Sequence, residues 1–359
     1  MKHKIFIIFS IFFLYYLPIS CEKQEKPKNT QYAEFSSYRE IPGITAEEIE
    51  AVEKIRETRD SFVYAVNYST EAFLDENNKI GGYAALFCEW LSGLFDIPFE
   101  PEIVRWDDLI AGLASLTIDF TGELTATSER RKTYFMTNAI AERSIKIMRI
   151  AGSEPLSTLE KSRPLVYAFL EGTINYDLVS PYLQDGFKTI FVSSHETAYR
   201  ALKNGTADAF IEDGPSEAAF DVFGDAIAED FFPLIYSQVS LTTQNPDLEP
   251  IISVVQKALD SVDVYRSLTR MYNQGYLDYL HQRLIMQLTQ EEKEYIRLHS
   301  TPETAVKIAA EYDNYPVSFF NAHVSRWQGI ALDILGEIEK YTGMSFKVVN
   351  NANTNGLSF

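Results

Sequence analysis

Apolar residues along the chain follow two alternating patterns. Short apolar or alternating runs predict strands at 61–68, 99–106 and 117–123. The segments between them, 81–95 and 106–116, have apolar residues at helical spacing. Strands that alternate with helices of about ten to fifteen residues are typical of a parallel sheet with helices on both faces. This part of the chain therefore predicts an α/β lobe.

The same alternation returns further along the chain. Strands are predicted at 163–172, 188–193 and 207–213, with helices at 173–183 and 194–205 between them. These elements predict a second α/β lobe. In such sheets a ligand binds in a crevice at the carboxyl ends of the strands.

Local signals at the helix 194–205 support this division. Ser193 and Glu196 have the spacing of a capping box, and Gly205 is expected to end the helix. An extended segment and two helices follow, at 233–243, 246–262 and 264–280.

The N-terminal segment has the features of a targeting sequence. A basic start precedes an apolar run at 5–17, which is shorter than the roughly 20 residues that span a bilayer. The following "LPISC" resembles the lipobox of bacterial lipoproteins, although Pro18 replaces the usual leucine. The resemblance implies cleavage after Ser20, acylation of Cys21 and a membrane-anchored location in the periplasm or at the cell surface. A simple secretory signal and an uncleaved anchor are the alternatives.

Residues 21–60 are polar and charged at their start, which predicts a tether leading to a short acidic helix at 45–57, with no core there. Cys88 lies within the apolar helix 81–95, so it is predicted to be a small buried apolar residue. A disulfide between Cys21 and Cys88 is the alternative.

Composition excludes some partners. The chain has 359 residues, enough for roughly two domains by length alone. Its 51 acidic residues outnumber the 32 basic ones, giving a net charge of −19. Nucleic acid, which requires a basic surface, is therefore not an expected partner. Adsorption to an anionic membrane is disfavoured for the same reason, whereas a small ligand is not.

An internal repeat predicts the start of a second copy of the domain near residue 305. The segment 65–104 is echoed by the segment 309–349 once a gap of three residues is allowed. The copy would contain a first strand, a helix and a second strand, too little to close a core alone. The matched positions, each 247 residues apart, are Gly82 with Gly329, Ala84 with Ala331 and Phe99 with Phe346.

Hydroxyl and basic side chains are concentrated in "FTGELTATSERRKTYFMT", residues 120–137. Thr127 is expected to cap a helix that starts at Ser128, leaving free backbone N–H groups that attract an anion. Arg130 can clamp a carboxylate with two parallel hydrogen bonds. An exposed capped helix with a basic first turn is the alternative.

Two further stretches complete a pattern. "LEGTINYDLV" places Gly172 and Thr173 between a strand and a helix, and "ADAFIEDGPSEAAF" places Asp213 at a strand end. With the stretch 120–137, they resemble the family 3 extracellular solute-binding proteins. That family has the two-lobed Venus flytrap fold, a type II periplasmic-binding-protein architecture with a hinge.

The resemblance covers residues 61–286 and the start of the second copy. A tandem arrangement with "LTQEEKEYIRLHS" between the copies resembles the periplasmic part of flytrap-containing sensor proteins. The expected boundaries are a signal peptide at 1–20, the tether and short helix at 21–60, a solute-binding domain at 61–286 (lobe 1 at about 61–149 and 238–286, lobe 2 at about 150–237), a linker at 287–304 and a truncated second solute-binding domain at 305–359.

The resemblance also implies roles for individual residues. Arg130, assisted by Thr125, would hold the carboxylate of an amino acid. Gly172 and Thr173 would offer backbone donors to the same carboxylate, and Asp213 would bind the amino group. The expected ligand contacts are Tyr68, Phe73, Glu123, Leu124, Thr125, Arg130, Gly172, Thr173 and Asp213.

Glu123 departs from the family pattern, which usually has Gly or Ser there. An acid at this position would contact a second ammonium group of a basic ligand, or bond the loop backbone and touch no ligand. The sequence leaves both interpretations open.

The expected function is the binding of an amino acid or a related zwitterion by a module of a signalling protein, with a sensor kinase or cyclase as partner. The alternative is a solute-binding lipoprotein that serves an ABC permease. A less favoured alternative is a periplasmic dehydratase-like enzyme on the same fold, with Glu123 as its acid/base. No cofactor is predicted, since the histidines form no metal-ligand pair and no glycine-rich phosphate loop is present.

Overall fold

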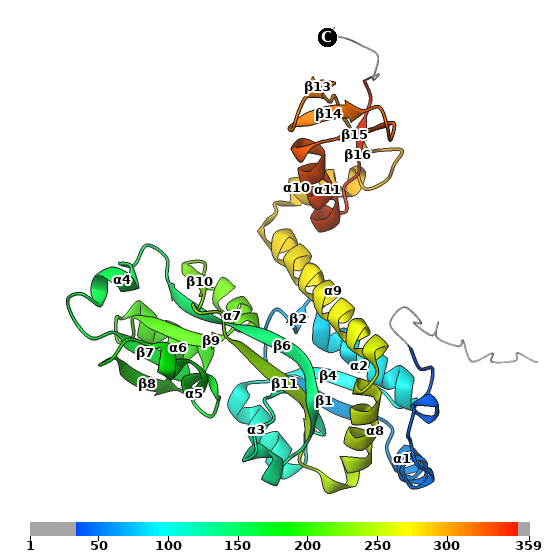
Figure 1. The fold of residues 1–359 in the computed structure, drawn as a ribbon, viewed down its shortest axis with the longest axis vertical. Helices are drawn as coiled ribbons and strands as arrows, with labels where there is room; N and C mark the ends of the chain where they lie inside the picture. Colours follow the sequence, from blue (N-terminus) through cyan, green and yellow to red (C-terminus); the bar gives the residue numbers. More distant parts are fainter. Residues whose placement is uncertain (1–33, 351–359) are drawn as a thin grey trace, which may run out of the picture.

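The computed structural model describes residues 34–350 and has the two-lobed α/β architecture that the sequence predicts (Figure 1). Cys21 and the rest of the predicted signal lie outside these residues. In lobe 1 the strands lie in the order β4-β1-β5-β11-β6, and the first three are parallel. These strands are β1 (Phe62–Val66), β4 (Phe99–Ile103), β5 (Phe120–Leu124), β6 (Phe135–Ile150) and β11 (Tyr236–Thr243).

The core of lobe 1 forms where apolar helix faces meet this sheet. Phe87 and Leu91 of α2 are fully buried, together with Phe62 and Phe120 of the sheet. Each such side chain contributes about 1.5–3 kcal/mol relative to an exposed one. Cys88 is also buried in this core, as predicted, and it is the cysteine within residues 34–350, where it forms no disulfide. The helices of lobe 1 are α2 (Tyr83–Phe95), α3 (Trp106–Ser115), α8 (Glu249–Leu259) and α9 (Val262–Gln287).

Lobe 2 has the strand order β10-β6-β9-β7-β8. The helix at 194–205 is confirmed as α6, but its cap is Ser194 rather than Ser193. The Ser194 hydroxyl accepts from the backbone N of Thr197, because Ser194 is the residue with extended backbone. The elements of lobe 2 are α4 (Leu156–Leu159), β7 (Val166–Leu170), α5 (Asn175–Val179), β8 (Lys188–Val192), α6 (His195–Lys203), β9 (Ala209–Asp213), α7 (Glu217–Asp221) and β10 (Ala226–Asp230).

Strand β6 belongs to both lobes. Its first part pairs antiparallel with β11 as far as Ser144, and its second part pairs with β9 from Ile145 onwards. This strand of 16 residues was not among the predicted elements. Its two halves pack in different cores, so no single alternation of apolar and polar residues runs through it. The crossing lies between the lobes and positions the site described below.

The helix predicted at 45–57 is confirmed as α1 (Ala46–Thr58), but the expectation that no core forms here is wrong. Val52 and Ile55 of α1 are buried, as are Tyr38 and Ile41 before it. All four join the core of lobe 1, because α1 presents apolar residues three apart to α8. The polar tether therefore does not extend to residue 60.

The C-terminal elements repeat the order of the first ones. Strand β12 pairs parallel with β16 across α11, as β1 pairs with β4 across α2. The residue before each helix is a glycine with positive φ, Gly82 at 95° and Gly329 at 124°. A second domain start stays a prediction that this order supports. The elements of this region are α10 (Gln290–Leu298), β12 (Val306–Ile308), β13 (Asp313–Asn314), β14 (Ser318–Asn321), β15 (Arg326–Gln328), α11 (Ile330–Thr342) and β16 (Phe346–Val348). In the first domain, β2 (Phe73–Leu74) and β3 (Ile80–Gly81) form a separate antiparallel pair before α2.

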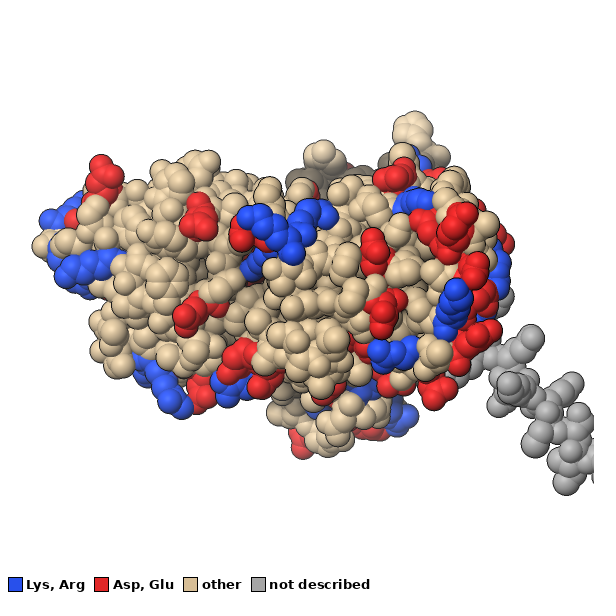
Figure 2. Space-filling model, turned by 90° about the horizontal axis from the view of Figure 1, so that it is seen from below, with Lys and Arg blue, Asp and Glu red and all other residues tan. Residues whose placement is uncertain are grey.

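Five short 3-10 turns complete the description. They are η1 (Tyr38–Glu40), η2 (Arg130–Lys132), η3 (Ser180–Tyr182), η4 (Gly214–Ser216) and η5 (Pro246–Leu248). Across residues 34–350, no helix combines the length and apolar character needed to cross a bilayer. On the face in Figure 2, acidic and basic side chains are interspersed rather than gathered into one basic patch.

Gly275 of α9 provides a test of the packing in lobe 1. A Cβ there would lie 2.3 Å from the backbone N of Tyr83, which cannot move without shifting α2. We expect Gly275→Ala to lower the free energy of unfolding by about 1–3 kcal/mol in urea titrations. Gly93→Ala, in an exposed helical position with open space, should raise it by about 0.5–1 kcal/mol. Equal stabilisation by both changes would contradict this packing.

Candidate functional site

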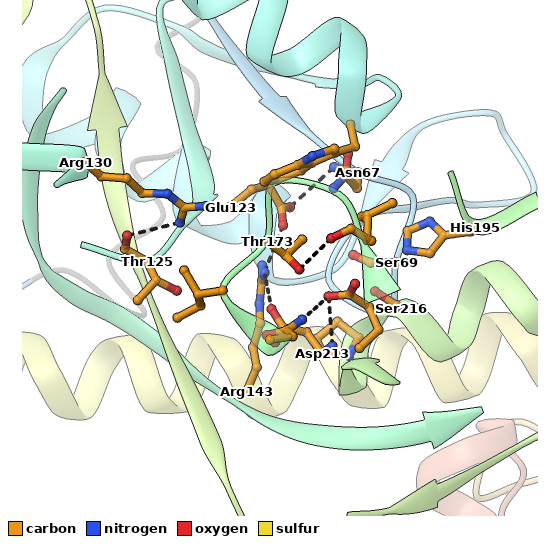
Figure 3. A pocket seen from close by; sticks show the side chains of 16 residues that line it. Asn67, Ser69, Glu123, Thr125, Arg130, Arg143, Thr173, His195, Asp213 and Ser216 are labelled. Carbon is orange, nitrogen blue, oxygen red and sulfur yellow. Dashed lines mark hydrogen bonds and ion pairs between the residues drawn. The ribbon is translucent and has the colours of Figure 1, made fainter. Parts of the chain in front are cut away.

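A cavity of about 30 Å³ lies between the two lobes, where the carboxyl ends of their strands meet (Figure 3). It has room for about two ordered water molecules. Lobe 1 contributes Asn67, Ser69, Trp106, Glu123, Thr125 and Arg130, lobe 2 contributes Leu170, Thr173, Ile174, Asn175, His195, Glu212, Asp213, Pro215 and Ser216, and Arg143 comes from the shared strand.

Hydrogen bonds across the cleft hold the lobes together. The backbone N of Thr70 donates to the carbonyl of Pro215 at 2.9 Å. The indole Nε1 of Trp106 donates to the carbonyl of Glu171 at 3.0 Å. Since the cavity is small in this closed arrangement, a ligand larger than a few atoms requires the lobes to separate.

Helix α9 adds a contact to lobe 2. Its N-terminal half packs in lobe 1, where Leu268 and Met271 are buried. Further along the helix, Arg283 forms an ion pair with Asp221 of α7 at 3.1 Å, and the hydroxyl of Tyr279 donates to the same carboxylate. One helix therefore touches both lobes.

Arg130 faces the cavity with only neutral hydrogen-bond partners. Its Nη1 donates to the carbonyl of Thr125 at 3.1 Å, and its Nη2 donates to the carbonyl of Gly172 in lobe 2 at 2.9 Å. In the described part of the chain it forms no ion pair. Burial lowers the pKa of Arg130, because desolvation disfavours the charged form. Its charge thus lacks a counter-ion.

The predicted helix at Ser128 is wrong. The chain forms only the 3-10 turn η2 there, and this turn ends at Lys132. The Thr127 hydroxyl does accept from the backbone N of Arg130, at 3.1 Å. A single short turn supplies no helix N-terminus for an anion, so any anion recognition falls to the Arg130 guanidinium.

Arg143 lies in the middle of the cleft among carboxylates. Its Nε and Nη2 donate to both oxygens of Glu71, at 2.9 and 2.7 Å, and its Nη1 donates to Glu123 at 2.8 Å. Asp213 of lobe 2 lies 3.6 Å from the same Nη1. The side chain of Arg143 is only 5% exposed. It therefore links acids of both lobes from the strand that the lobes share.

This cluster shifts the pKa values of its members. Although burial opposes its charged form, Arg143 has a pKa well above the ordinary value because of Glu123 and Glu71. Burial raises the pKa of Asp213, against the opposing effect of Arg143. Burial also raises the pKa of Glu212 well above its usual range, and the charge of Asp213 adds to this. The cluster therefore holds more carboxylates than its single cation can balance.

Glu123 behaves largely as the second interpretation of the sequence expected. One carboxylate oxygen accepts from the backbone N of Asn67 at 3.3 Å, and the other pairs with Arg143. Its side chain still lines the cavity, but both oxygens have protein partners. Asp213 is engaged through one oxygen, which accepts from the Ser237 hydroxyl at 2.7 Å.

Of the predicted contacts, Glu123, Thr125, Arg130, Thr173 and Asp213 line the cavity. Gly172 lies at its edge, where its carbonyl accepts from Arg130.

The remaining three predicted contacts lie elsewhere. Phe73 and Tyr68 pack in a cluster with Tyr279 of α9, and Leu124 is in the core under the sheet. The aromatic side chain on the cavity is Trp106. In an extended segment successive side chains point to opposite sides, which directs Tyr68 away and Asn67 towards the cleft.

Sequence reasoning also missed the lining residues of lobe 2 that lie deepest. Glu212 is 4% exposed, and one of its carboxylate oxygens accepts from the Asn175 side chain. His195 is largely buried against the rings of Phe210 and Phe220. An acid within the apolar run "ADAFIED" is a signal for Glu212, because a buried strand rarely carries an uncompensated charge.

Removal of the Arg143 charge tests the cluster. Arg143→Met would leave buried carboxylates without their cation, so we expect a loss of about 3–5 kcal/mol in the free energy of unfolding. The control is Arg200→Met in α6, whose ion pair with Glu196 is exposed and should contribute less than about 1 kcal/mol. Chemical denaturation of the three proteins gives the comparison. Similar losses for both variants would exclude a central role for Arg143.

His195 predicts a dependence of stability on pH. Burial lowers its pKa to about 4, whereas the unfolded value is about 6.5. As the pH falls through this window, the unfolded chain takes up a proton that the folded chain does not. Stability from this group is therefore intact above about pH 6.5 and falls by about 2–3 kcal/mol towards pH 4.

The measurement is the unfolding free energy of wild type and His195→Gln at pH 7 and pH 4.5. The wild type should lose more on acidification than the variant. An equal loss in both proteins would mean that His195 titrates normally in the folded state.

Comparison with known proteins places the fold. No curated protein matches the chain. Similar solved structures include a mutant of ArgBP from T. maritima (21% identity, 62% of this chain and 99% of that chain, TM-score 0.46). A second is AbpA, an amino acid ABC transporter substrate-binding protein from Streptococcus pneumoniae bound to L-arginine (16% identity, 63% of this chain and 98% of that chain, TM-score 0.50). A third is the periplasmic VFT2 domain of BvgS from Bordetella pertussis (19% identity, 64% of this chain and 99% of that chain, TM-score 0.49).

At these identities the solved structures show the fold alone. A family model, in contrast, matches residues 62–274, which is more than half of the chain, and it confirms the resemblance found in the sequence. The chain belongs to the bacterial extracellular solute-binding proteins, family 3.

Proposed function

We propose that this chain binds an amino acid or a related zwitterion between its two lobes, outside the cytoplasm, as the ligand-sensing module of a signalling protein. The observation that carries the proposal is the unpaired charge of Arg130 at the cleft. A half-buried guanidinium with only carbonyl partners has donors left over. A ligand carboxylate would supply the missing negative charge and accept from them.

Groups of both lobes support the same ligand. Thr125 of lobe 1 and Thr173 of lobe 2 line the cavity with Arg130, so a carboxylate bound there would contact both lobes. Asp213 is the partner for an ammonium group, because only one of its oxygens has a hydrogen bond and the other is 3.6 Å from Arg143. Binding at both ends would stabilise the closed arrangement.

Binding is favoured over catalysis by the surroundings of Glu123. The members of the family are mainly binding proteins. A dehydratase-like activity requires a free acid or base in the cleft, and Glu123 is the candidate from the sequence. Both oxygens of this carboxylate are engaged within the protein, one by Arg143 and the other by the backbone N of Asn67, so neither is free to exchange a proton with a bound molecule.

The role in signalling rests on the repeated order of elements at 306–348, which supports a tandem arrangement of domains. The partner would then be a sensor kinase or cyclase module, and an ABC permease is the partner under the transport alternative. A lipid anchor at Cys21 stays part of this proposal, since the residue lies outside the described part of the chain.

Substitution of Arg130 tests the function. A thermal-shift screen of the full chain against amino acids and organic acids first identifies a ligand. Calorimetry should then show that Arg130→Ala weakens binding by more than tenfold, since loss of a buried charge partner costs about 2–5 kcal/mol. Arg130→Lys should restore only part of the affinity, because an ammonium group cannot replace the planar fork.

The matched control is Arg131→Ala. Arg131 donates to the carbonyls of Met136 and Thr137 and does not line the cavity, yet its loss changes the net charge equally. It should bind with wild-type affinity. The proposal fails if Arg130→Ala also binds as the wild type does.

A further inference from the structure

Polar atoms without a hydrogen-bond partner are concentrated at the cavity between the lobes. Six buried side-chain N or O atoms in residues 34–350 lack a partner, and three of them belong to cavity-lining residues. These are Oδ1 of Asn67, Nε2 of His195 and Oε2 of Glu212. Buried polar atoms are ordinarily paired, so this concentration indicates groups that a ligand would satisfy. We call Asn67, His195 and Glu212 the inner subsite.

We propose that the inner subsite takes the cationic side chain of a basic amino acid, so that the ligand is arginine, lysine or a close analogue. This inference rests on the function proposed above and specifies the class of its ligand.

The three free atoms of the inner subsite are suited to accept hydrogen bonds. The other oxygen of Glu212 is held by the side chain of Asn175 and by the backbone N of Asp213 at 3.1 Å, which fixes the carboxylate. His195 is neutral at neutral pH because burial lowers its pKa to about 4, so Nε2 accepts when Nδ1 carries the proton. A guanidinium or ammonium group offers the donors that match such acceptors.

The charges of the cleft point the same way. Glu71, Glu123, Glu212 and Asp213 surround the single guanidinium of Arg143 or adjoin it. Three negative charges are left over when all four acids are ionised. The ammonium group of a zwitterion offsets only one of them. A second cation on the ligand reduces the surplus further. Without such a cation, Glu212 is the acid that most readily holds a proton, because burial raises its pKa.

The two ends of the cleft are separated in space. In Figure 3, Arg130 and Thr125 lie at the left of the pocket, whereas Asn67 and His195 lie at the right, with Thr173 between them. An extended ligand with a carboxylate at one end and a cation at the other matches this arrangement. Because the closed cavity holds only about two water molecules, such a ligand would enter an open cleft, and the lobes would then close around it less tightly than they close on the empty cavity.

The test compares L-arginine with L-citrulline, which has nearly the same shape but a neutral side chain. In calorimetry, the full wild-type chain should bind L-arginine about tenfold more tightly than L-citrulline, because hydrogen bonds to a charged group are stronger than those to a neutral one. Glu212→Gln keeps the size of the side chain but removes its charge. It should reduce the preference for L-arginine over L-citrulline by about tenfold.

Two further variants sharpen the comparison. Asn67→Asp adds a charge to the inner subsite without changing its size, so it should increase the preference for L-arginine and keeps the test decisive if Glu212→Gln does not fold. Glu160→Gln removes an exposed acid of lobe 2 and should leave the preference unchanged.

The outcomes separate the two proposals. Equal wild-type affinities for L-arginine and L-citrulline, or a preference that neither subsite variant alters, would overturn the cationic subsite while the proposed binding of amino acids stands. If neither of these compounds, nor L-lysine, nor any neutral amino acid binds, both proposals fail. A preference that moves in opposite directions in the two subsite variants supports the assignment.

Discussion

The ion pairs of Arg143 are the interaction on which the rest of the cleft depends. Four carboxylates meet between the lobes, and bringing them together away from water costs free energy unless a cation is held among them. Arg143 is fixed on the strand shared by both lobes, so it is present whether the cleft is open or closed. Glu71 and Glu123 bind it from lobe 1, and Asp213 approaches it from lobe 2, where β9 pairs with β6 at Ile145. The third acid thus adjoins a guanidinium that is already paired, which leaves negative charge for a ligand to balance.

Much of the fold followed from local patterns in the sequence. The alternation of apolar runs predicted β1, α2, β4, α3 and β5, because the helices have one buried apolar face and β1 and β5 are short runs buried almost throughout. Residues next to strand ends were also predictable, since the carboxyl ends of parallel strands converge on one edge of a sheet. Thr125 after β5, Thr173 after β7 and Asp213 at the end of β9 reach the cavity for this reason.

The parts that escaped prediction are those whose environment changes within an element. Strand β6 pairs with β11 in its first part and with β9 in its second part, so no single alternation of apolar and polar residues runs along it. Arg143 lies next to this change of partner. The direction of a side chain from a loop was also beyond local patterns. Tyr68 and Phe73 were expected at the ligand, but the approach of α9 from far along the sequence draws them into a contact with Tyr279. Residues from distant segments decide which side of such a loop is buried.

Helix α9 links the position of lobe 2 to the elements that follow the first domain. It has 26 residues and is therefore about 39 Å long, and its Cterminal end leads to α10 and the elements beyond it (Figure 1). Its first turns are fixed in lobe 1, whereas Arg283 and Tyr279 reach Asp221 of lobe 2. A swing of lobe 2 away from lobe 1 would break the contacts with Asp221, whereas the ring contact of Tyr279 with Phe73 and the hydrogen bond of His281 to Tyr341 do not involve lobe 2. The state of the cleft would then change how many contacts hold the outer half of this helix, and so how firmly the elements beyond it are placed.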